Sequence, residues 1–304
     1  MQQTAMDYKR RVCSAMNFIS RNLGRDLSLE EIAATASFSM FHFHRIFKAV
    51  VGETVAGFTR RLRLEAAANH LLAHPHTDIT SIALDAGFST SQNFATAFRQ
   101  QFDMTPTDYR KSKMANTVSK EQDAPSLHTV YDPDTAFGSS TNNERRVTME
   151  AEVKEMPELH VAYVRKIGPY GKETCEQAFC ELMQWAGPRG YVGSGPMLGV
   201  YWDNPEVTPP EKCRVDACVG VPEGTATEGS VALQTISGGP YGVCHFELTA
   251  DNFQQAWEDA FAWIVSTGQE CDDKPCYEVY HNNAAEHPEG KWIFDICIPL
   301  KAKS

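Results

Sequence analysis

The chain has 304 residues, 42% of them hydrophobic and 22% charged, a composition that supports folded cores and excludes a wholly disordered protein. Its net charge of −11 is unevenly divided. Residues 1–113 carry 14 Lys and Arg against 10 Asp and Glu, a net charge of +4, whereas residues 114–304 carry 14 against 29, a net charge of −15. A basic part joined to an acidic part indicates two functions, one of them with a polyanion.

The sequence holds no sign of a membrane span, a secretory signal or a bound cofactor. No stretch approaches the roughly 18 uninterrupted apolar residues of a membrane helix. The N-terminus has no apolar core followed by a cleavage site, and nine cysteines are an odd number, which favours reduced thiols in the cytoplasm. Pairs of cysteines recur at a C-x4-C spacing without the second ligand pair of a zinc site. We therefore expect no metal site, no cofactor and no membrane partner.

A repeat occupies the first third of the chain. Residues 32–39 recur at 82–89 with an offset of 50, and residues 43–58 recur at 94–109 with an offset of 51. Each copy has the pattern of a short helix, a tight turn and a second helix, whose apolar residues recur every three or four positions. Two tandem helix–turn–helix units are therefore predicted, joined by a helix over residues 55–73.

Turn and cap residues support this organisation. Ser28 and Glu31 have the spacing of a capping box and predict the start of the first helix. The turn of the second copy places Gly87 at a position that suits left-handed backbone, whereas the first copy has Ser37 there, a residue less suited to it. The second helices are expected to begin at Ser39 and Ser89.

Each second helix buries its apolar face and leaves the opposite face free for a DNA major groove. Arg can bond guanine through two hydrogen bonds, Gln and Asn can do so with adenine, and an aromatic edge can meet a thymine methyl group. The alternative is an ordinary solvated helix face, which the tandem arrangement makes less favoured. Successive grooves lie about 34 Å apart, so one chain can cover a site as a monomer or weak dimer. The candidate DNA-binding residues are Phe41, His44 and Arg45 in the first copy and Ser91, Gln92, Asn93 and Thr96 in the second.

These segments, FSMFHFHRIFKAVVGET (38–54) and GFSTSQNFATAFRQQFDMTPTDYRK (87–111), resemble the AraC/XylS-type double helix–turn–helix. The resemblance covers residues 7–113 and implies an all-α DNA-binding domain over residues 1–113. It also implies promoter DNA as a partner. The base-reading positions that it implies are Phe41, His44 and Arg45 in the first copy and Gln92, Asn93 and Thr96 in the second. The chain departs from the family pattern at Asp103, where many members have Gly.

A second repeat fills the last half of the chain. KIGPYG (166–171) recurs as SGGPYG (237–242), and a strand-like run is expected before each and an amphipathic helix after each. Tyr201/Tyr280, Asp216/Asp295 and Cys218/Cys297 all recur with an offset of 79. We therefore predict an α+β domain over residues 148–304, with β-α-β-β twice and pseudo-twofold symmetry. Residues 114–147, polar and without periodicity, are the predicted linker.

The last half, from its GPYG segments to CYEVYHNNAAEHPEGKWIFDICIPL (276–300), resembles the GyrI-like (tandem SHS2) effector-binding domain. The resemblance implies a cleft between the two repeats that binds cationic or amphipathic small molecules, with a carboxylate on a core strand of the second repeat. Glu278 occupies that position, and Gly199 is its counterpart in the first repeat.

Glu278 lies within the strand-like run YEVY, where a carboxylate is uncommon unless one face is wet. Two interpretations remain open: a solvent-facing Glu, or a partly buried carboxylate whose charge a bound cation compensates. Trp257 is a further candidate for a wall of the cleft, but it falls on the apolar stripe of its helix, which favours a place in the core. The candidate cleft walls, able to make cation–π or flat apolar contacts, are Tyr170, Tyr201, Trp202 and Tyr241.

Three function classes remain. The favoured one is a transcription regulator that binds promoter DNA and a small-molecule effector and acts on RNA polymerase. The second is an enzyme, since some stand-alone relatives of the second domain resemble hydrolases with a Tyr–Glu pair. The third is a protein-binding module, since other members bind gyrase. Neither alternative needs a double DNA-reading unit, so we expect a regulator that is not an enzyme.

Overall fold

The computed structural model of the protein describes residues 2–113 and 149–302, and the predicted linker, 114–147, lies outside these residues. The chain divides into two compact units. One runs from Ser14 to Arg145, and the other consists of residues 1–13 together with Arg146–Ser304. Within the described ranges, no helix combines the length and apolarity of a membrane span.

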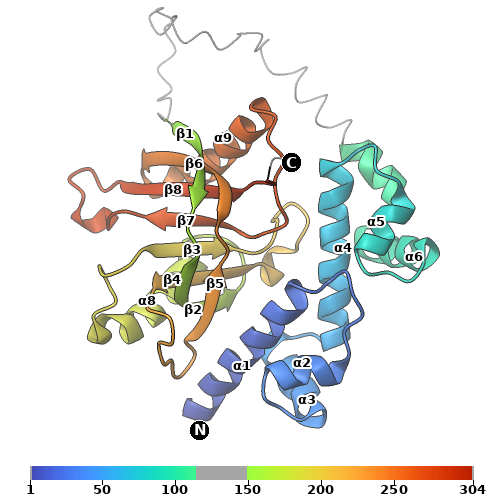
Figure 1. The fold of residues 1–304 in the computed structure, drawn as a ribbon, viewed down its shortest axis with the longest axis horizontal. Coiled ribbons are helices and arrows are strands. Elements are labelled where there is room, and N and C mark those ends of the chain that lie inside the picture. Colours follow the sequence, from blue (N-terminus) through green and yellow to red (C-terminus); the bar gives the residue numbers. More distant parts are fainter. Residues whose placement is uncertain (1, 114–148, 303–304) are drawn as a thin grey trace, which may run out of the picture. The chain divides into compact units, whose positions relative to one another are not determined.

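The first part of the chain is helical (Figure 1). Its elements are α1 (Gln2–Ser20), α2 (Leu29–Thr35), α3 (Met40–Val51), α4 (Val55–Ala73), α5 (Ile79–Asp85) and α6 (Ser91–Phe102), followed by helical residues 106–113. The pairs α2–α3 and α5–α6 are the two predicted helix–turn–helix units, and α4 has the predicted bounds of the joining helix. The all-α prediction for this part is therefore confirmed.

Helix α4 holds both units in place. The ring of Phe58 meets the ring of Phe47 in α3 at 5.5 Å, and Arg60 donates to Gln100 of α6 at 2.9 Å. Arg61 is buried between two carboxylates, Glu53 at 2.8 Å and Glu65 at 3.0 Å. The guanidinium of Arg61 therefore supports the fold, since it faces carboxylates and is buried away from solvent.

The cap residues match the sequence in part. The hydroxyl of Ser28 accepts from the backbone N–H of Glu31 at 3.1 Å, as the capping box predicts. The carboxylate of Glu31, however, pairs with Arg25 at 2.7 Å, so the reciprocal half of the box is not formed. Helix α6 has Thr90 as its cap, one residue later than expected from Ser89.

Two left-handed backbone positions occur in each unit. Ser37 (φ 53°) and Gly87 (φ 80°) occupy the first in the two copies, and Gly52 (φ 84°) and Asp103 (φ 55°) occupy the second. Each position thus has glycine in one copy and a side chain in the other. Left-handed backbone strains a residue with a Cβ by roughly 1–2 kcal/mol, although Asp tolerates it better than most.

Replacing Ser37 with glycine is expected to raise the free energy of unfolding by about 0.5–1 kcal/mol, because the strain relieved exceeds the added chain entropy. Gly87→Ala should lower it, because a Cβ there would lie 2.3 Å from the carbonyl oxygen of Leu23. Urea denaturation followed by far-ultraviolet circular dichroism measures both changes. A Ser37→Gly protein less stable than wild type contradicts this explanation.

The second unit contains the α+β part of the chain, residues 149–302. Its first repeat comprises β1 (Glu150–Met156), β2 (Leu159–Ile167), α8 (Lys172–Ala186), β3 (Met197–Tyr201) and β4 (Arg214–Gly220). Its second comprises β5 (Ala232–Ile236), β6 (Gly239–Leu248), α9 (Phe253–Ser266), β7 (Cys276–Tyr280) and β8 (Trp292–Pro299). Short 3-10 turns occur at Gly187–Arg189, Pro210–Lys212, Ala250–Asn252 and Ala284–Glu286.

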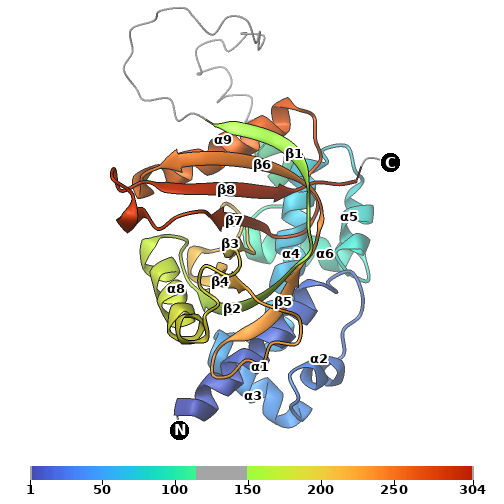
Figure 2. The ribbon, with the colours of Figure 1, turned by 60° about the vertical axis from the view of Figure 1, so that its left-hand side comes forward.

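The strands form one eight-stranded antiparallel sheet in the order β1-β6-β8-β7-β3-β4-β2-β5 (Figure 2). This order is symmetric about its centre, where Gly199 of β3 lies opposite Glu278 of β7. These two residues are 79 positions apart, so the pseudo-twofold axis passes between them. The predicted β-α-β-β repeat with pseudo-twofold symmetry is confirmed, with one addition: each repeat begins with an extra strand that pairs with the other repeat.

The two GPYG segments are not structural equivalents, which corrects the expectation drawn from them. Residues 168–171 form the turn between β2 and α8, whereas residues 239–242 begin strand β6, with the whole strand still to come before α9. The helices and following strands repeat with offsets of 78 and 79, but these two segments are 71 residues apart. The same four letters therefore occur in a turn in the first repeat and at the start of a strand in the second.

Both helices cover the same face of the sheet. Helix α8 packs through Ala178 and Leu182 on β2 and β4, and α9 packs through Ala256 and Ala260 on β6 and β8. The central strands β3 and β7 lie between the part of the sheet that α8 covers and the part that α9 covers. A separate core cluster, which includes Tyr163, Tyr241 and Tyr277, occupies the opposite face because side chains alternate along each strand.

Candidate functional site

The first candidate surface is the outer face of α3. Phe43 and Phe47 are buried, which turns the other side of this helix outward. Phe41 on that side is 74% exposed, a large fraction for an aromatic ring. His44 and Arg45 are also exposed. The three predicted residues therefore share one accessible face, with an apolar edge and two groups able to donate hydrogen bonds.

The second candidate surface is the start of α6. Gln92, Asn93 and Thr96 are exposed, and Ser91 is half-buried. The Asn93 side chain donates to Ser89 Oγ at 3.3 Å, and the Thr96 hydroxyl donates to the backbone oxygen of Gln92 at 3.0 Å. Gln92 has the longest side chain of these four residues, and its amide is exposed.

The candidate ligand site lies at the centre of the sheet, on the face that carries the helices. Glu278 has 0% of its surface exposed, so the interpretation of a solvent-facing Glu is wrong. Its carboxylate accepts from Tyr201 Oη at 2.8 Å, from Trp257 Nε1 at 2.7 Å, and from the hydroxyl of Tyr280. Three donors from β3, α9 and β7 thus converge on one carboxylate.

Burial dominates the chemistry of this carboxylate. It raises the pKa of Glu278 above the ordinary value, while the hydrogen bonds from Tyr280, Tyr201 and Trp257 act in the opposite direction. Burial, reinforced by the neighbouring Glu278 charge, also raises the pKa of both tyrosines, which stay neutral donors. No cationic side chain is among these hydrogen-bond partners. The site can therefore gain free energy from a cation that reaches it.

The glycine opposite Glu278 makes room for the phenols. A Cβ on Gly199 would lie 3.1 Å from the hydroxyl oxygen of Tyr280 and 3.4 Å from that of Tyr201. The two repeats therefore differ chemically at this point, because the first has a glycine where the second has a carboxylate. Cys175 lies close to this group: burial raises the pKa of its thiol, the charge of Glu278 acts in the same direction, and the nearby Tyr201 hydroxyl acts against it.

Two predicted wall residues lie elsewhere. Trp202 donates to Asp216 at 2.7 Å, and its ring stacks under the guanidinium of Arg165 at 4.7 Å. Tyr241 packs on Tyr277 within the core of the opposite sheet face. Neither residue therefore lies beside Glu278, since aromatic character alone does not tell which face of a strand a side chain occupies.

Tyr170 lies next to the site without touching the carboxylate. Its ring meets Tyr201 edge-on at 5.1 Å, and its hydroxyl bonds the backbone of Asp203 and Arg214. It therefore positions Tyr201. Of the four predicted wall residues, Tyr201 alone contacts Glu278.

Two further residues contact Glu278. Trp257 was a candidate wall residue for which the core was favoured; it does pack in the core, and its indole N–H also reaches Glu278. Tyr280 was noted as a repeat partner of Tyr201 and not as a wall residue. The signal for Tyr280 was present, because residues two apart on a strand share a face and YEVY places it beside Glu278.

Comparison with known proteins agrees with this geometry. Residues 149–301 match the family described as the GyrI-like small molecule binding domain. The chain belongs to the GyrI-like family. The GyrI-like part of the chain is preceded by residues 9–112, which match the family described as a helix-turn-helix domain. The protein is therefore a DNA-binding regulator with a ligand-sensing domain, as the sequence predicted.

Three relatives each match one part of the chain. Over 159 residues the chain is 35% identical to the DNA gyrase inhibitor of Escherichia coli (strain K12), covering 51% of this chain and 99% of that protein. The DNA gyrase inhibitor of Citrobacter koseri is 32% identical over 162 residues, covering 51% and 100%. A solved AraC-type transcriptional regulator from Chromobacterium violaceum is 28% identical and covers 34% of this chain and 91% of its own, with a TM-score of 0.32.

Proposed function

We propose that this regulator binds an amphipathic or cationic small molecule at Glu278 and reads promoter DNA with α3 and α6. The observation that carries the proposal is the fully buried Glu278 carboxylate, held by three aromatic donors in a chain that also carries two helix–turn–helix units. The ligand changes transcription to the extent that it prefers one state of the protein over another.

A cation suits the Glu278 site for two reasons. The carboxylate is removed from water, so a positive group brought to it gains more than it would at an exposed site. Aromatic rings surround the carboxylate, and their faces attract cations. Trp257, which is half-buried, contacts Tyr201 edge-on at 5.5 Å and lies over Phe261 at 6.1 Å. We infer that the ligand replaces the indole N–H as the partner of Glu278.

On the DNA side, we infer that Arg45 and Gln92 make the main base contacts, supported by Phe41, His44, Ser91, Asn93 and Thr96. Arg45→Ala is expected to weaken binding to a duplex selected from a random library by the wild-type protein. The expected loss is about 1–3 kcal/mol, or roughly 5- to 150-fold, because a bidentate contact to guanine disappears. Fluorescence anisotropy at fixed salt measures it.

Arg45→Lys is the matched control, since it keeps the charge and loses the two-pronged guanidinium geometry. A base contact predicts that the lysine variant also loses affinity for the selected duplex while keeping the salt dependence of wild type. If the lysine variant binds like wild type, Arg45 contacts a phosphate and the base-reading assignment is wrong.

A further partner and the location follow from this function. Because a regulator acts at promoters, we propose RNA polymerase as a partner and the cytoplasm, where the chromosomal DNA lies, as the location. Because two reading helices occur in one chain, we propose that it binds its site as a monomer or weak dimer.

Two other functions have observations in their favour. A Tyr–Glu pair exists at Glu278, so acid–base hydrolysis of a small ester is a second candidate. Identity to DNA gyrase inhibitors makes gyrase binding a third. Three parallel measurements separate these functions: in vitro transcription with an added cationic ligand, analysis of that ligand for reaction products, and a gyrase supercoiling reaction. Ligand-dependent transcription without turnover or gyrase inhibition supports the regulator.

A further inference from the structure

The face of the sheet opposite α8 and α9 carries the same cross-strand arrangement twice. Asp216 of β4 lies directly opposite Arg165 of β2, and Asp295 of β8 lies directly opposite His245 of β6. The third member of each group follows a central strand: the backbone N–H of Trp202 bonds Arg214, and that of His281 bonds Ile293. Arg165–Asp216–Trp202 and His245–Asp295–His281 are therefore equivalent under the pseudo-twofold symmetry.

The group in the first repeat is closed, by which we mean that its carboxylate is buried and bonded to donors that cannot ligate a metal ion. The guanidinium of Arg165 donates two hydrogen bonds to Asp216, both at 2.6 Å, and Trp202 donates a third at 2.7 Å. Arginine and tryptophan offer donors only and cannot ligate a metal ion. All three side chains serve the fold.

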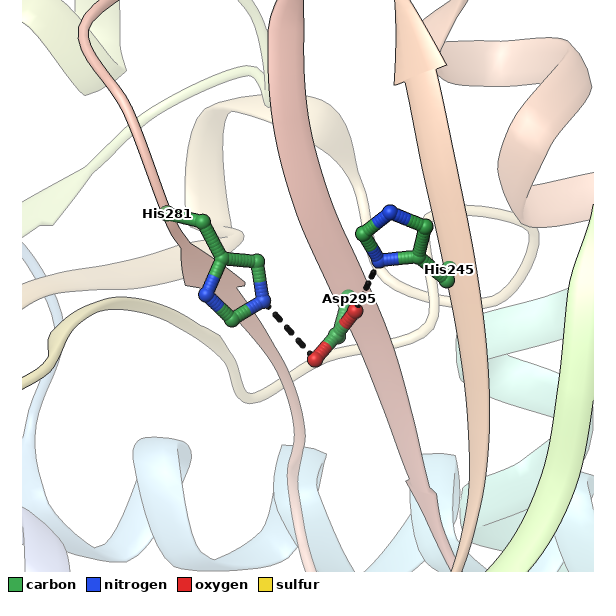
Figure 3. A group of neighbouring side chains, drawn as sticks. All are labelled: His245, His281 and Asp295. Carbon is green, nitrogen blue, oxygen red and sulfur yellow. Dashed lines mark hydrogen bonds and ion pairs between the residues drawn. The ribbon is translucent and has the colours of Figure 1, made fainter.

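The group in the second repeat has different chemistry at the same positions (Figure 3). His245 Nδ1 lies 2.7 Å from one carboxylate oxygen of Asp295, and His281 Nε2 lies 2.9 Å from the other. The ligand atoms of all three residues lie within 4.8 Å of one another. The side chains of His245 and His281 are 44% and 43% exposed, and that of Asp295 is 20% exposed.

We propose that His245, His281 and Asp295 bind a divalent first-row transition-metal ion such as Zn²⁺. Zinc takes imidazole nitrogen and carboxylate oxygen at about 2.0–2.2 Å, which separates tetrahedral ligand atoms by roughly 3.4 Å. The observed spacings allow this separation with small side-chain rotations. The exposed face leaves the remaining coordination position to water or a small anion. Two imidazoles with one carboxylate select such ions over Mg²⁺ and Ca²⁺, which prefer oxygen ligands.

Metal binding would link β6, β8 and the residue after β7, the strand that carries Glu278 on its other face. An ion that binds the folded state stabilises it by mass action, so the melting temperature should rise with its concentration. Stabilisation by metal is thus a readout independent of transcription and of the small-molecule ligand.

Titration of the full-length protein with Co²⁺, under reducing conditions, tests the site. His245→Asn and His281→Asn should each weaken binding at least tenfold, the size that even outer-shell changes around a metal reach. His160→Asn is the matched control, because His160 is also a strand histidine and its ring hydrogen-bonds the Thr235 hydroxyl instead of a carboxylate. It should bind Co²⁺ like wild type.

The double variant His245→Arg/His281→Trp rebuilds the closed group of the first repeat. It removes both metal-binding imidazoles and puts in their place the residue types that the first repeat has at the equivalent positions, so that it is expected to fold. Wild type should take up one Co²⁺ more than this variant, with visible d–d bands and no thiolate charge-transfer band, and only wild type should melt at a higher temperature when the ion is added. Equal uptake by the two proteins, or a thiolate band on the extra ion, overturns the proposal.

Discussion

Replacing Asp216 with alanine is expected to lower the free energy of unfolding of the second unit by about 3–5 kcal/mol. Asp216 and Arg165 are fully buried and joined by two hydrogen bonds. Trp202 and Gln234 donate to the same carboxylate at 2.7 and 2.9 Å. Alanine would leave a buried guanidinium uncompensated and two further donors without their acceptor, a combination that costs more than a cavity alone.

The symmetry of the sheet supplies the matched control. Asp295→Ala removes the equivalent carboxylate from partly exposed histidines, so its effect should stay within about 1 kcal/mol. All five tryptophans lie between residues 185 and 292, so tryptophan fluorescence during urea denaturation reports this unit. An equal loss of free energy of unfolding in Asp216→Ala and Asp295→Ala would contradict the difference between the buried Asp216 group and the partly exposed Asp295 group.

Glu278→Gln is expected to weaken binding of a permanent cation such as tetraphenylphosphonium by about 1.5–3 kcal/mol, roughly 10- to 150-fold. The amide keeps the shape of the side chain and removes the charge. Neutral triphenylphosphine oxide should bind both proteins alike. Quenching of tryptophan fluorescence measures both ligands, because Trp257 touches the carboxylate. The control is Glu258→Gln, on the exposed side of α9; a loss of equal size there would point to general surface charge instead.

The raised pKa of Glu278 predicts two opposite pH effects. The folded state holds its proton to higher pH than the unfolded chain, so ionisation lowers the free energy of unfolding as the pH rises above about 4.5 toward the raised pKa. A cation prefers the ionised site, so its affinity falls as the pH drops through the same window. The contribution of Glu278 to both slopes should be absent from Glu278→Gln, so that the difference between the two proteins, measured by urea denaturation and ligand titration from pH 4 to 8, isolates it.

Much of the fold could be predicted because local and repeated patterns determine it. Helix α4 has its predicted bounds, since Thr54 caps it and His74 with Pro75 ends it. The place of Glu278 on a core strand was also predicted, whereas its burial was left open between two interpretations that only the structure decides. The bounds of a helix depend on residues near one another in sequence.

What sequence reasoning missed depends on which sheet face and which strand neighbour a residue has. Trp202 and Tyr241 are aromatic but lie on the face opposite Glu278, whereas Trp257 reaches it from a helix. The pairing of β1 with β6 and of β5 with β2 is an exchange between repeats that periodicity does not encode. His245, His281 and Asp295 are far apart in sequence and meet only through strand pairing, so no short ligand spacing announced them.

Sensing of a cation at Glu278 is tested most directly by a cation titration of in vitro transcription from a promoter that carries the selected site, with wild-type and Glu278→Gln proteins. We expect transcription with wild type to change as tetraphenylphosphonium is added, with a midpoint matching its binding constant, and Glu278→Gln to need at least about tenfold more cation. Transcription that stays constant while the cation binds, or an identical midpoint in the variant, would contradict it.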